Sequence, residues 1–311
     1  MATSCTMECF SWVPGEDEKF KCRSCKICNG LGCVGQLPGM GGVSSSENFI
    51  ENCLSWDLFY KKSSVDVQKK INSITVRPED IGIAPVTGAV QNIGFLRESD
   101  FYQPYFAAAC QAGNFICVGD GAPDEKLQLG HKAVCSLNTK AYYFFKPYPD
   151  EILKRRIDLV RENAIAVGMD IDAFNIVTMR NQAHLEYKTR EQVEAFRAYS
   201  KLPIMLKGIF TQKDIELCKQ VKPDICVVSN HGGRVDTQKG STMDFLLKNA
   251  ETLHSCCGQV WVDGGIRTRN NIQSALYLGA DKVLIARGFI SRLIKGGVKG
   301  MVEYSNSLLS N

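Results

Sequence analysis

Short apolar runs alternate with longer amphipathic stretches along the chain from about residue 81 onward. This alternation is typical of repeated βα units that build a parallel sheet. The pattern contains eight such runs, and eight strands are the number that closes a (β/α)8 barrel. We therefore predict an α/β fold of the TIM-barrel type, with strands that begin near Ile81, Phe115, Ala141, Ala164, Pro203, Asp224, Gln259 and Lys282.

The segments between these runs carry helix signals. Thr189 with Gln192 and Thr211 with Asp214 match the capping box, in which two side chains satisfy free amides at a helix start. The segment TRNNIQSALYLGAD has an apolar face and ends in Gly279 at the position after a helix. A doubly wound open sheet is the alternative, but its G-x-G-x-x-G fingerprint after the first strand is missing.

Residues 1–80 lack this alternation, and the stretch GLGCVGQLPGMGGVSSSENF is rich in Gly and Ser. We expect residues 1–80 to form an N-terminal extension with a Cys-rich motif and a loop over the barrel. Residues 81–311 would then form the barrel domain.

Composition excludes several classes of protein. The net charge of +4, with 44% hydrophobic and 23% charged residues, argues against intrinsic disorder, a coiled coil, or binding to nucleic acid or a membrane surface. No apolar run approaches the roughly 18 residues that span a bilayer, and the first residues do not resemble an export signal. We expect a cytoplasmic protein whose core cysteines are reduced. Whether it forms a homo-oligomer stays open.

Four of the 14 cysteines stand in one C-x2-C-x2-C-x4-C run. The spacing is similar to that of iron-sulfur ferredoxins, although the last gap is longer and no proline follows. Four thiolates also suit a structural zinc site, and reduced or redox-active surface thiols are the third reading. The candidate ligands are Cys22, Cys25, Cys28 and Cys33.

Polar residues end several of the predicted strands, where barrel enzymes place their active sites. Lys207 ends the fifth run, Ser229 to His231 end the sixth, and Asp263 ends the seventh. In SNHGGRVD, His231 and Arg234 follow a strand directly, which suits a general base beside an arginine that binds a carboxylate. The blander reading of His231 is a capping or packing role.

Glycine turns with arginines follow the seventh and eighth runs, in DGGIRTR and ARG. Backbone amides and a helix start commonly hold a phosphate at this place in barrels. Arg267 and Arg287 would add positive charge, so the sequence predicts a phosphate site there.

At SNHGGRVD, DGGIRT and LGADKVLIARG the sequence resembles the FMN-dependent α-hydroxy-acid oxidase and dehydrogenase family, which includes glycolate oxidase and lactate oxidase. The likeness covers about residues 203–290 most strongly. It implies a (β/α)8 barrel that binds FMN and oxidises a small 2-hydroxy acid to the 2-keto acid for an unknown electron acceptor.

The resemblance also implies roles for single residues. His231 matches the catalytic base, Arg234 and Tyr143 the groups that hold the substrate, and Asp170 the carboxylate that orients the histidine. The residues that match the FMN contacts are Pro85, Val86, Thr87, Lys207, Ser229, Asp263, Gly264, Gly265, Ile266, Arg267, Ala286 and Arg287.

Several positions depart from the family pattern. The usual third-strand glutamine falls at Ala141 and the fourth-strand threonine at Gly168, and Arg180 is only a candidate for a second substrate arginine. Two alternatives remain open. One is an FMN barrel enzyme of the type 2 isopentenyl diphosphate isomerase kind, and the other is a flavin- and metal-containing redox sensor or electron carrier.

Overall fold

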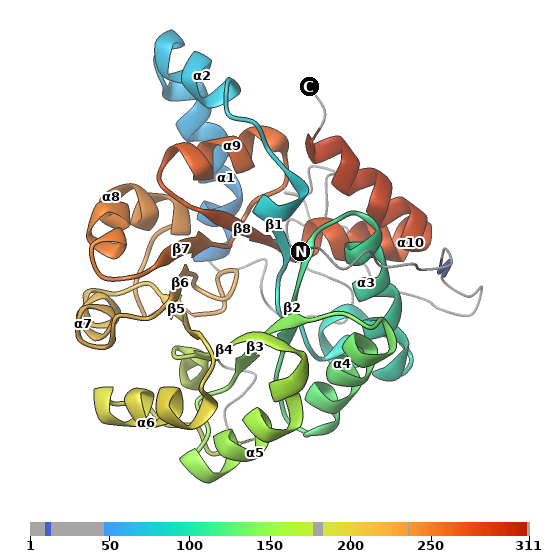
Figure 1. Ribbon diagram of the computed structural model, residues 1–311. Helices are drawn as coiled ribbons and strands as arrows, with labels where there is room; N and C mark the ends of the chain where they lie inside the picture. The colour runs from blue at the N-terminus through green and yellow to red at the C-terminus, as the bar shows by residue number, and fades with distance from the viewer. Residues whose placement is uncertain (1–9, 14–46, 177–182, 236, 310–311) are drawn as a thin grey trace.

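The computed structural model describes residues 10–13, 47–176, 183–235 and 237–309. Within them eight parallel strands pair in sequence order, and the first pairs with the last, so that the sheet closes into a barrel (Figure 1). The eight-strand prediction is therefore confirmed. The strands are β1 (Ile81–Ile83), β2 (Phe115–Gly119), β3 (Ala141–Phe145), β4 (Ala164–Asp170), β5 (Ile204–Ile209), β6 (Ile225–Val228), β7 (Gln259–Val262) and β8 (Lys282–Ile285).

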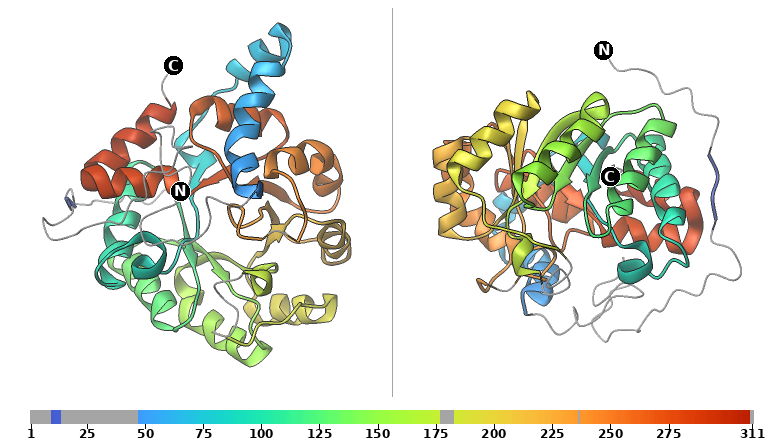
Figure 2. Two further views of the ribbon diagram at one scale, coloured as in Figure 1. Left: turned by 180° about the vertical axis from the view of Figure 1, so that it is seen from behind. Right: turned by 90° about the horizontal axis from the view of Figure 1, so that it is seen from below.

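A helix follows each strand and covers the outside of the barrel (Figure 2). These are α3 (Ser99–Gln111), α4 (Glu125–Ser136), α5 (Asp150–Val160), α6 (Arg190–Ser200), α7 (Gln212–Val221), α8 (Thr242–His254), α9 (Arg269–Tyr277) and α10 (Arg287–Leu309), the last interrupted at Gly296 and Gly297. The predicted helix starts at Thr189 and Thr211 are capping boxes. Helix α9 stops before Gly279, whose φ of +98° suits glycine.

Two further helices precede the barrel, α1 (Glu47–Lys62) and α2 (Val65–Asn72). They fall in the range expected to be an extension, and the sequence analysis did not predict them. Helix α1 packs against α8 and α9, and the view from behind shows it beside them (Figure 2). The four-cysteine run at 22–33 lies outside the described residues.

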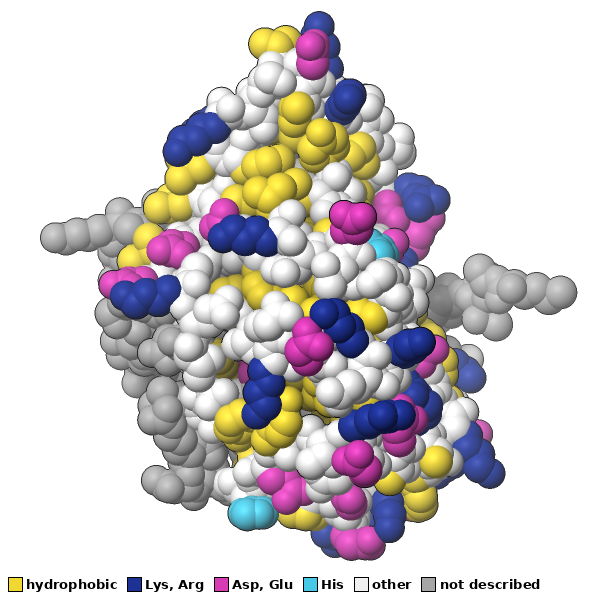
Figure 3. Space-filling model, turned by 90° about the vertical axis from the view of Figure 1, so that its left-hand side faces the viewer, with side chains coloured by type: hydrophobic (Ala, Val, Ile, Leu, Met, Phe, Trp, Pro, Cys, Tyr) yellow, Lys and Arg dark blue, Asp and Glu magenta, His cyan; other side chains and the backbone are white. Residues whose placement is uncertain are grey.

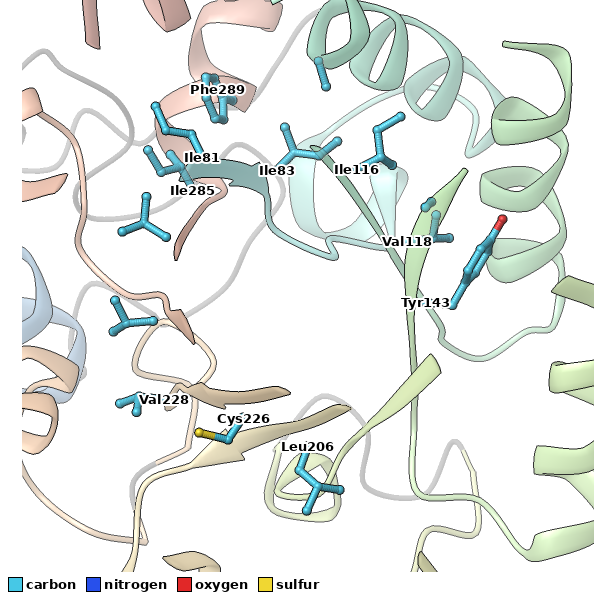
Figure 4. Packing of buried hydrophobic residues seen from close by; sticks show 14 of the residues in the cluster. Ile81, Ile83, Ile116, Val118, Tyr143, Leu206, Cys226, Val228, Ile285 and Phe289 are labelled. Carbon is cyan, nitrogen blue, oxygen red and sulfur yellow. The ribbon is translucent and has the colours of Figure 1, made fainter. Parts of the chain in front are cut away.

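The strands bury two layers of side chains, because successive residues of a strand point to opposite faces. One layer fills the barrel interior and includes Phe144, Met205 and Trp261. The rings of Phe115 and Tyr142 pack on Trp261 at centroid distances of 4.9 and 5.0 Å and help to fill the barrel from within. The outer layer faces the helices, and Figure 4 shows some of its members, including Ile83, Val118 and Leu206.

The distribution of charged side chains on the surface agrees with the modest net charge. On the face shown in Figure 3, acidic and basic side chains are interspersed over the helices. None of the helices in the described part of the chain is long and apolar enough to cross a membrane.

Candidate active site

A cavity opens at the carboxyl ends of the strands, with about 990 Å³ of empty space including its mouth. One wall is apolar and contains Ala84, Pro85, Val86, Leu284 and Ala286. The other groups are mostly charged or come from glycine turns. They include Lys146, Lys207, His231, Arg234, Asp263, Gly264, Gly265, Arg267 and Arg287.

His231 lies between two carboxylates. Its Nδ1 is 2.8 Å from an Asp172 carboxylate oxygen, and its Nε2 is 3.4 Å from an Asp170 oxygen. Asp170 was expected to orient the histidine, but Asp172 is the carboxylate that accepts the hydrogen bond from Nδ1. Asp170 ends β4 and faces Nε2, whereas Asp172 follows in the turn and reaches Nδ1 on the other side of the ring.

The place of Asp172 depends on a glycine. Gly208 in β5 has a φ of +94°, and a Cβ on this residue would collide with the Asp172 carboxylate. His231 itself has a φ of +52°, a conformation that non-glycine residues seldom adopt. Such strain is common at functional sites that the surrounding structure holds in place.

Asp170 is the centre of a buried charge network. Its oxygens lie 2.6 Å from Lys146 Nζ and 3.3 Å from Lys207 Nζ. Although burial opposes this, Lys146, Lys207 and His231 hold the pKa of Asp170 well below its usual range. Asp170 is therefore an anion at neutral pH.

Lys207 is buried at the end of β5, where it is also 3.5 Å from an Asp263 oxygen and donates to Ser229 Oγ at 3.3 Å. Burial disfavours its charged form, but Asp170 and Asp263 raise the pKa of Lys207 above its ordinary value. Ser229 does not line the cavity. Its hydroxyl instead accepts hydrogen bonds from Lys207 and from the His231 amide, so it positions both residues.

Tyr143, the substrate contact expected on the third strand, does not line the cavity, whereas Lys146 does. Tyr143 is fully buried on the outer face of β3, where its hydroxyl lies 3.0 Å from His131 Nδ1 in α4 (Figure 4). Phe144 points into the barrel, so the next inward position beyond the strand belongs to Lys146. The expected position, Tyr143, is one residue away from an inward-facing position, so its side chain lies on the outer side of the barrel wall.

Arg234 lines the cavity close to His231 in sequence. Desolvation lowers the pKa of Arg234 to about 10, which still leaves the guanidinium charged at neutral pH. Arg267 and Arg287 reach the same cavity from the turns after β7 and β8. The structure therefore brings together the predicted base, the predicted carboxylate-binding arginine and the predicted phosphate turns, and it leaves Tyr143 outside.

The sequence of residues 143–311 matches the family model described as FMN-dependent dehydrogenase. The chain belongs to this family. It is 36% identical over 113 residues to 2-hydroxyacid oxidase 2 of Bos taurus, and 34% identical over 116 residues to L-lactate oxidase of Lactobacillus jensenii. These matches cover 36% and 37% of the chain, but only 32% and 28% of the relatives' length.

The fold is similar to that of solved family members. A crystal structure of mandelate oxidase with benzoyl-formic acid superimposes with a TM-score of 0.57 at 25% identity, covering 74% of the chain and 70% of that protein. The chain is thus similar in sequence to the FMN-dependent dehydrogenase family and in fold to mandelate oxidase.

The cavity fits the FMN that this family name implies. Its apolar wall at Pro85, Val86 and Leu284 suits a flat ring, and the buried Lys207 ammonium suits the negative charge of a reduced flavin. Arg267 and Arg287 supply two cations for a phosphate. Thr87 at the edge of the wall accepts, through its carbonyl, a hydrogen bond from Asn92 at 2.7 Å.

Helix α1 builds this FMN-dependent dehydrogenase site from outside the barrel, a role that the sequence analysis missed. The fully buried Asn52 side chain donates to Asn230 Oδ1 at 2.7 Å and accepts from the Thr242 amide at 2.9 Å. Trp56 donates to the Gly264 carbonyl, and the Arg287 guanidinium lies 4.3 Å from the centre of the Phe49 ring. The spacing of Phe49, Cys53 and Trp56 follows a helical period and could have revealed the helix.

The glycines of the strand-seven turn lie against helix α1. Gly265 has a φ of +77°, and a Cβ there would collide with the Asn52 backbone of α1. The turn thus contains glycine because helix α1 lies against it.

The metal expectation stays a prediction. Cys22, Cys25, Cys28 and Cys33 lie outside the described residues, as does Arg180. Across the part of the chain that the structure describes, no group of three or more His, Cys, Asp or Glu side chains could hold a metal ion.

Proposed function

We propose that this protein oxidises a small 2-hydroxy acid to the 2-keto acid with FMN as its cofactor. The observation that carries the proposal is the position of His231, held at Nδ1 by Asp172 in the same cavity as Arg234 and the buried Lys207. The relatives named 2-hydroxyacid oxidase and L-lactate oxidase support the same reaction class.

FMN would lie along Pro85, Val86 and Thr87, with its phosphate toward Arg267 and Arg287. When bound, this cofactor accepts the two electrons that leave the substrate. Lys207 stabilises negative charge on the ring system, because its ammonium is fixed by Asp170 and Asp263 and stays protonated.

His231 acts as the base through Nε2. The Asp172 carboxylate accepts a hydrogen bond from Nδ1–H, which fixes the tautomer with the lone pair on Nε2. That nitrogen is buried and has no hydrogen-bond partner among the residues that the structure describes. It is therefore available to take a proton from the substrate, and the nearby Asp170 anion stabilises the imidazolium that results.

Arg234 binds the substrate carboxylate. A guanidinium offers two parallel N–H donors to a carboxylate, which fixes the acid and points its α-carbon. Since desolvation strengthens the interaction of Arg234 with an anion, the residue discriminates against uncharged alcohols.

The test is anaerobic reduction of the FMN-loaded protein by a panel of 2-hydroxy acids that includes short aliphatic and aromatic members. The loss of flavin absorbance measures the reduction. The proposal predicts rapid bleaching by at least one 2-hydroxy acid and none by the matching 2-deoxy acid. Full retention of the oxidised spectrum with every member of the panel would contradict it.

A further inference from the structure

A cysteine, a histidine and a tyrosine form a connected group on the outer wall of the barrel. His131 and Cys135 lie four residues apart on α4, so their side chains share one face of that helix. Tyr143 lies on β3, and its ring points out of the barrel toward α4 (Figure 4). None of these three residues lines the candidate active site. The group is therefore separate from the proposed oxidation of a hydroxy acid.

The three side chains are joined by short contacts. The Sγ of Cys135 lies 3.5 Å from His131 Nε2, and His131 Nδ1 lies 3.0 Å from the Tyr143 hydroxyl. A nucleophile within reach of a base, with a third group that orients the base, is the arrangement that activates weak nucleophiles in enzymes. Each ring nitrogen of His131 thus has its own partner, the thiol on one side and the hydroxyl on the other.

The sulfur is also held by a second element. Cys135 Sγ lies 3.5 Å from Asn163 Oδ1 in the short 3-10 helix η4 (Arg161–Asn163). Asn163 in turn donates through Nδ2 to the Thr139 carbonyl at 3.4 Å. The thiol is therefore placed by α4 and by the connection before β4 together. A side chain that is already placed loses less freedom when it reacts.

The thiol is open to solvent, and its neighbouring base is neutral. Of the cysteines in the part of the chain that the structure describes, Cys135 is the one that is exposed. Burial lowers the pKa of the half-buried His131, so its ring is uncharged at pH 7. In the tautomer whose Nδ1–H donates to the Tyr143 oxygen, the lone pair lies on Nε2 and faces the thiol.

We propose that Cys135 is a site of thiol–disulfide exchange with low-molecular-weight disulfides, with His131 as its base and Tyr143 as the group that orients His131. The proton of the Cys135 thiol passes to His131 Nε2 while the sulfur attacks the disulfide. A new S–S bond forms to one sulfur of the reagent, and the S–S bond of the reagent breaks. The departing sulfur takes the proton from the His131 imidazolium and leaves as a thiol. One thiol and one disulfide are thus exchanged for another thiol and another disulfide.

The product is a mixed disulfide on the outer wall. Among the described residues, the contacts of Cys135 are with His131 and Asn163 and include no second thiol that could displace the adduct. The adduct should therefore persist until an external thiol attacks it. During either step the Tyr143 oxygen accepts the hydrogen bond from Nδ1–H and so stabilises the imidazolium.

The test incubates the FMN-loaded full chain with oxidised glutathione at pH 7. The rate is followed as the glutathione adduct on the tryptic peptide 133–140, which contains Cys135 and no other cysteine. His131→Gln should form the adduct at least about tenfold more slowly, because the base is lost. His184→Gln, the same substitution at an exposed histidine outside the group, should react like the unaltered protein. Equal rates for the unaltered protein and His131→Gln would overturn the proposal.

The pH dependence separates a base from a merely structural role. The advantage of the unaltered protein over His131→Gln should be full at pH 7 and should shrink as the pH falls below about 6.5, where histidine becomes protonated. At pH 9.5 a thiol ionises without the help of a base, so the two rates should agree within about twofold. If His131→Gln were as slow at pH 9.5, relative to the unaltered protein, as at pH 7, the effect would come from lost exposure of the sulfur, and the proposal would be wrong.

Tyr143→Phe tests the orienting group. The variant keeps the buried ring but loses the hydroxyl that contacts Nδ1, so we expect adduct formation at pH 7 to slow by about threefold or more. Dithiothreitol should remove the adduct from the peptide in every variant. An unaltered rate in Tyr143→Phe would overturn the role assigned to Tyr143.

Discussion

Two carboxylates flank His231, and each faces a different nitrogen of its ring. Asp172 holds Nδ1 at 2.8 Å, while Asp170 lies 3.4 Å from Nε2 and shares its charge with Lys146 and Lys207. In the proposed mechanism, the first carboxylate sets the tautomer, and the second stabilises the imidazolium after the proton transfer.

Substitutions in β3 and directly after it compare the roles of Tyr143 and Lys146. Lys146→Met should lower kcat/KM by about tenfold or more, because Asp170 loses its closest cation at 2.6 Å beside the base. Tyr143→Phe, the matched control on the outer face, removes only the contact to His131 and should change kcat/KM less than about twofold. The reverse order of effects in steady-state kinetics would restore Tyr143 as the substrate contact.

Arg234→Lys should weaken the use of substrate while leaving bound FMN in place. Lysine keeps the charge but cannot offer two parallel donors to a carboxylate, so we expect a loss of about 2–4 kcal/mol in transition-state stabilisation. This is measured from kcat/KM for the best substrate, with the flavin content of the variant as the control. Near-normal kcat/KM would mean that the carboxylate binds elsewhere.

Asp170 links stability to pH. Its pKa is depressed in the folded protein, so its contribution is present above the unfolded value near 3.9 and is lost as pH falls toward the folded pKa. Asp170→Asn leaves Lys146 and Lys207 without their shared anion and should lower the free energy of unfolding at pH 7 by about 3–5 kcal/mol. The gap between the two proteins should shrink by about 1 kcal/mol at pH 3.

Denaturant unfolding at the two pH values measures this gap. A difference that stays constant from pH 7 to pH 3 would mean that the folded protein does not depress the pKa of Asp170.

At the scale of elements, helix α1 is the part of the site that comes from outside the βα units. Its side chains fasten the turns after β6 and β7, through Asn52 to Asn230 and through Trp56 to the Gly264 carbonyl. Phe49 lies under Arg287 in the turn after β8. The three turns that carry the candidate residues are therefore fixed by a single helix.

Gly265→Ala tests this contact between α1 and the strand-seven turn. The new Cβ would meet the Asn52 backbone, and φ is +77°, so we expect a loss of more than about 2 kcal/mol in stability and weaker FMN binding. Gly240→Ala is the control, because its φ is also positive while no atom lies within 4 Å of a Cβ there. Equal unfolding midpoints for the two variants would argue against tight packing of α1.

The elements that the sequence predicted are those with strong local signals. Strand β6 is an apolar run, and α7 begins at the capping box of Thr211 and Asp214, so both positions follow from short segments. Residues 47–62 were missed because the glycine and serine stretch before them suggested a loop. Asp172 and Lys146 were missed for another reason: their roles depend on which side of the barrel wall each faces, and one residue of register decides that.

On the scale of the whole molecule, the candidate site occupies one end of the barrel. The cavity with His231 and Arg234 lies at the carboxyl ends of the strands. Interior side chains such as Trp261 and Phe144 fill the space between the ends.

The central claim is that His231 takes the substrate proton during flavin reduction. The most direct measurement is anaerobic stopped-flow reduction of bound FMN by the best 2-hydroxy acid, in the unaltered protein and in His231→Gln. The account predicts that the variant keeps its FMN and flavin spectrum but is reduced about 10²–10⁴-fold more slowly, because general-base removal commonly has this effect. A folded, flavin-loaded His231→Gln protein that the substrate reduces at the normal rate would contradict the account.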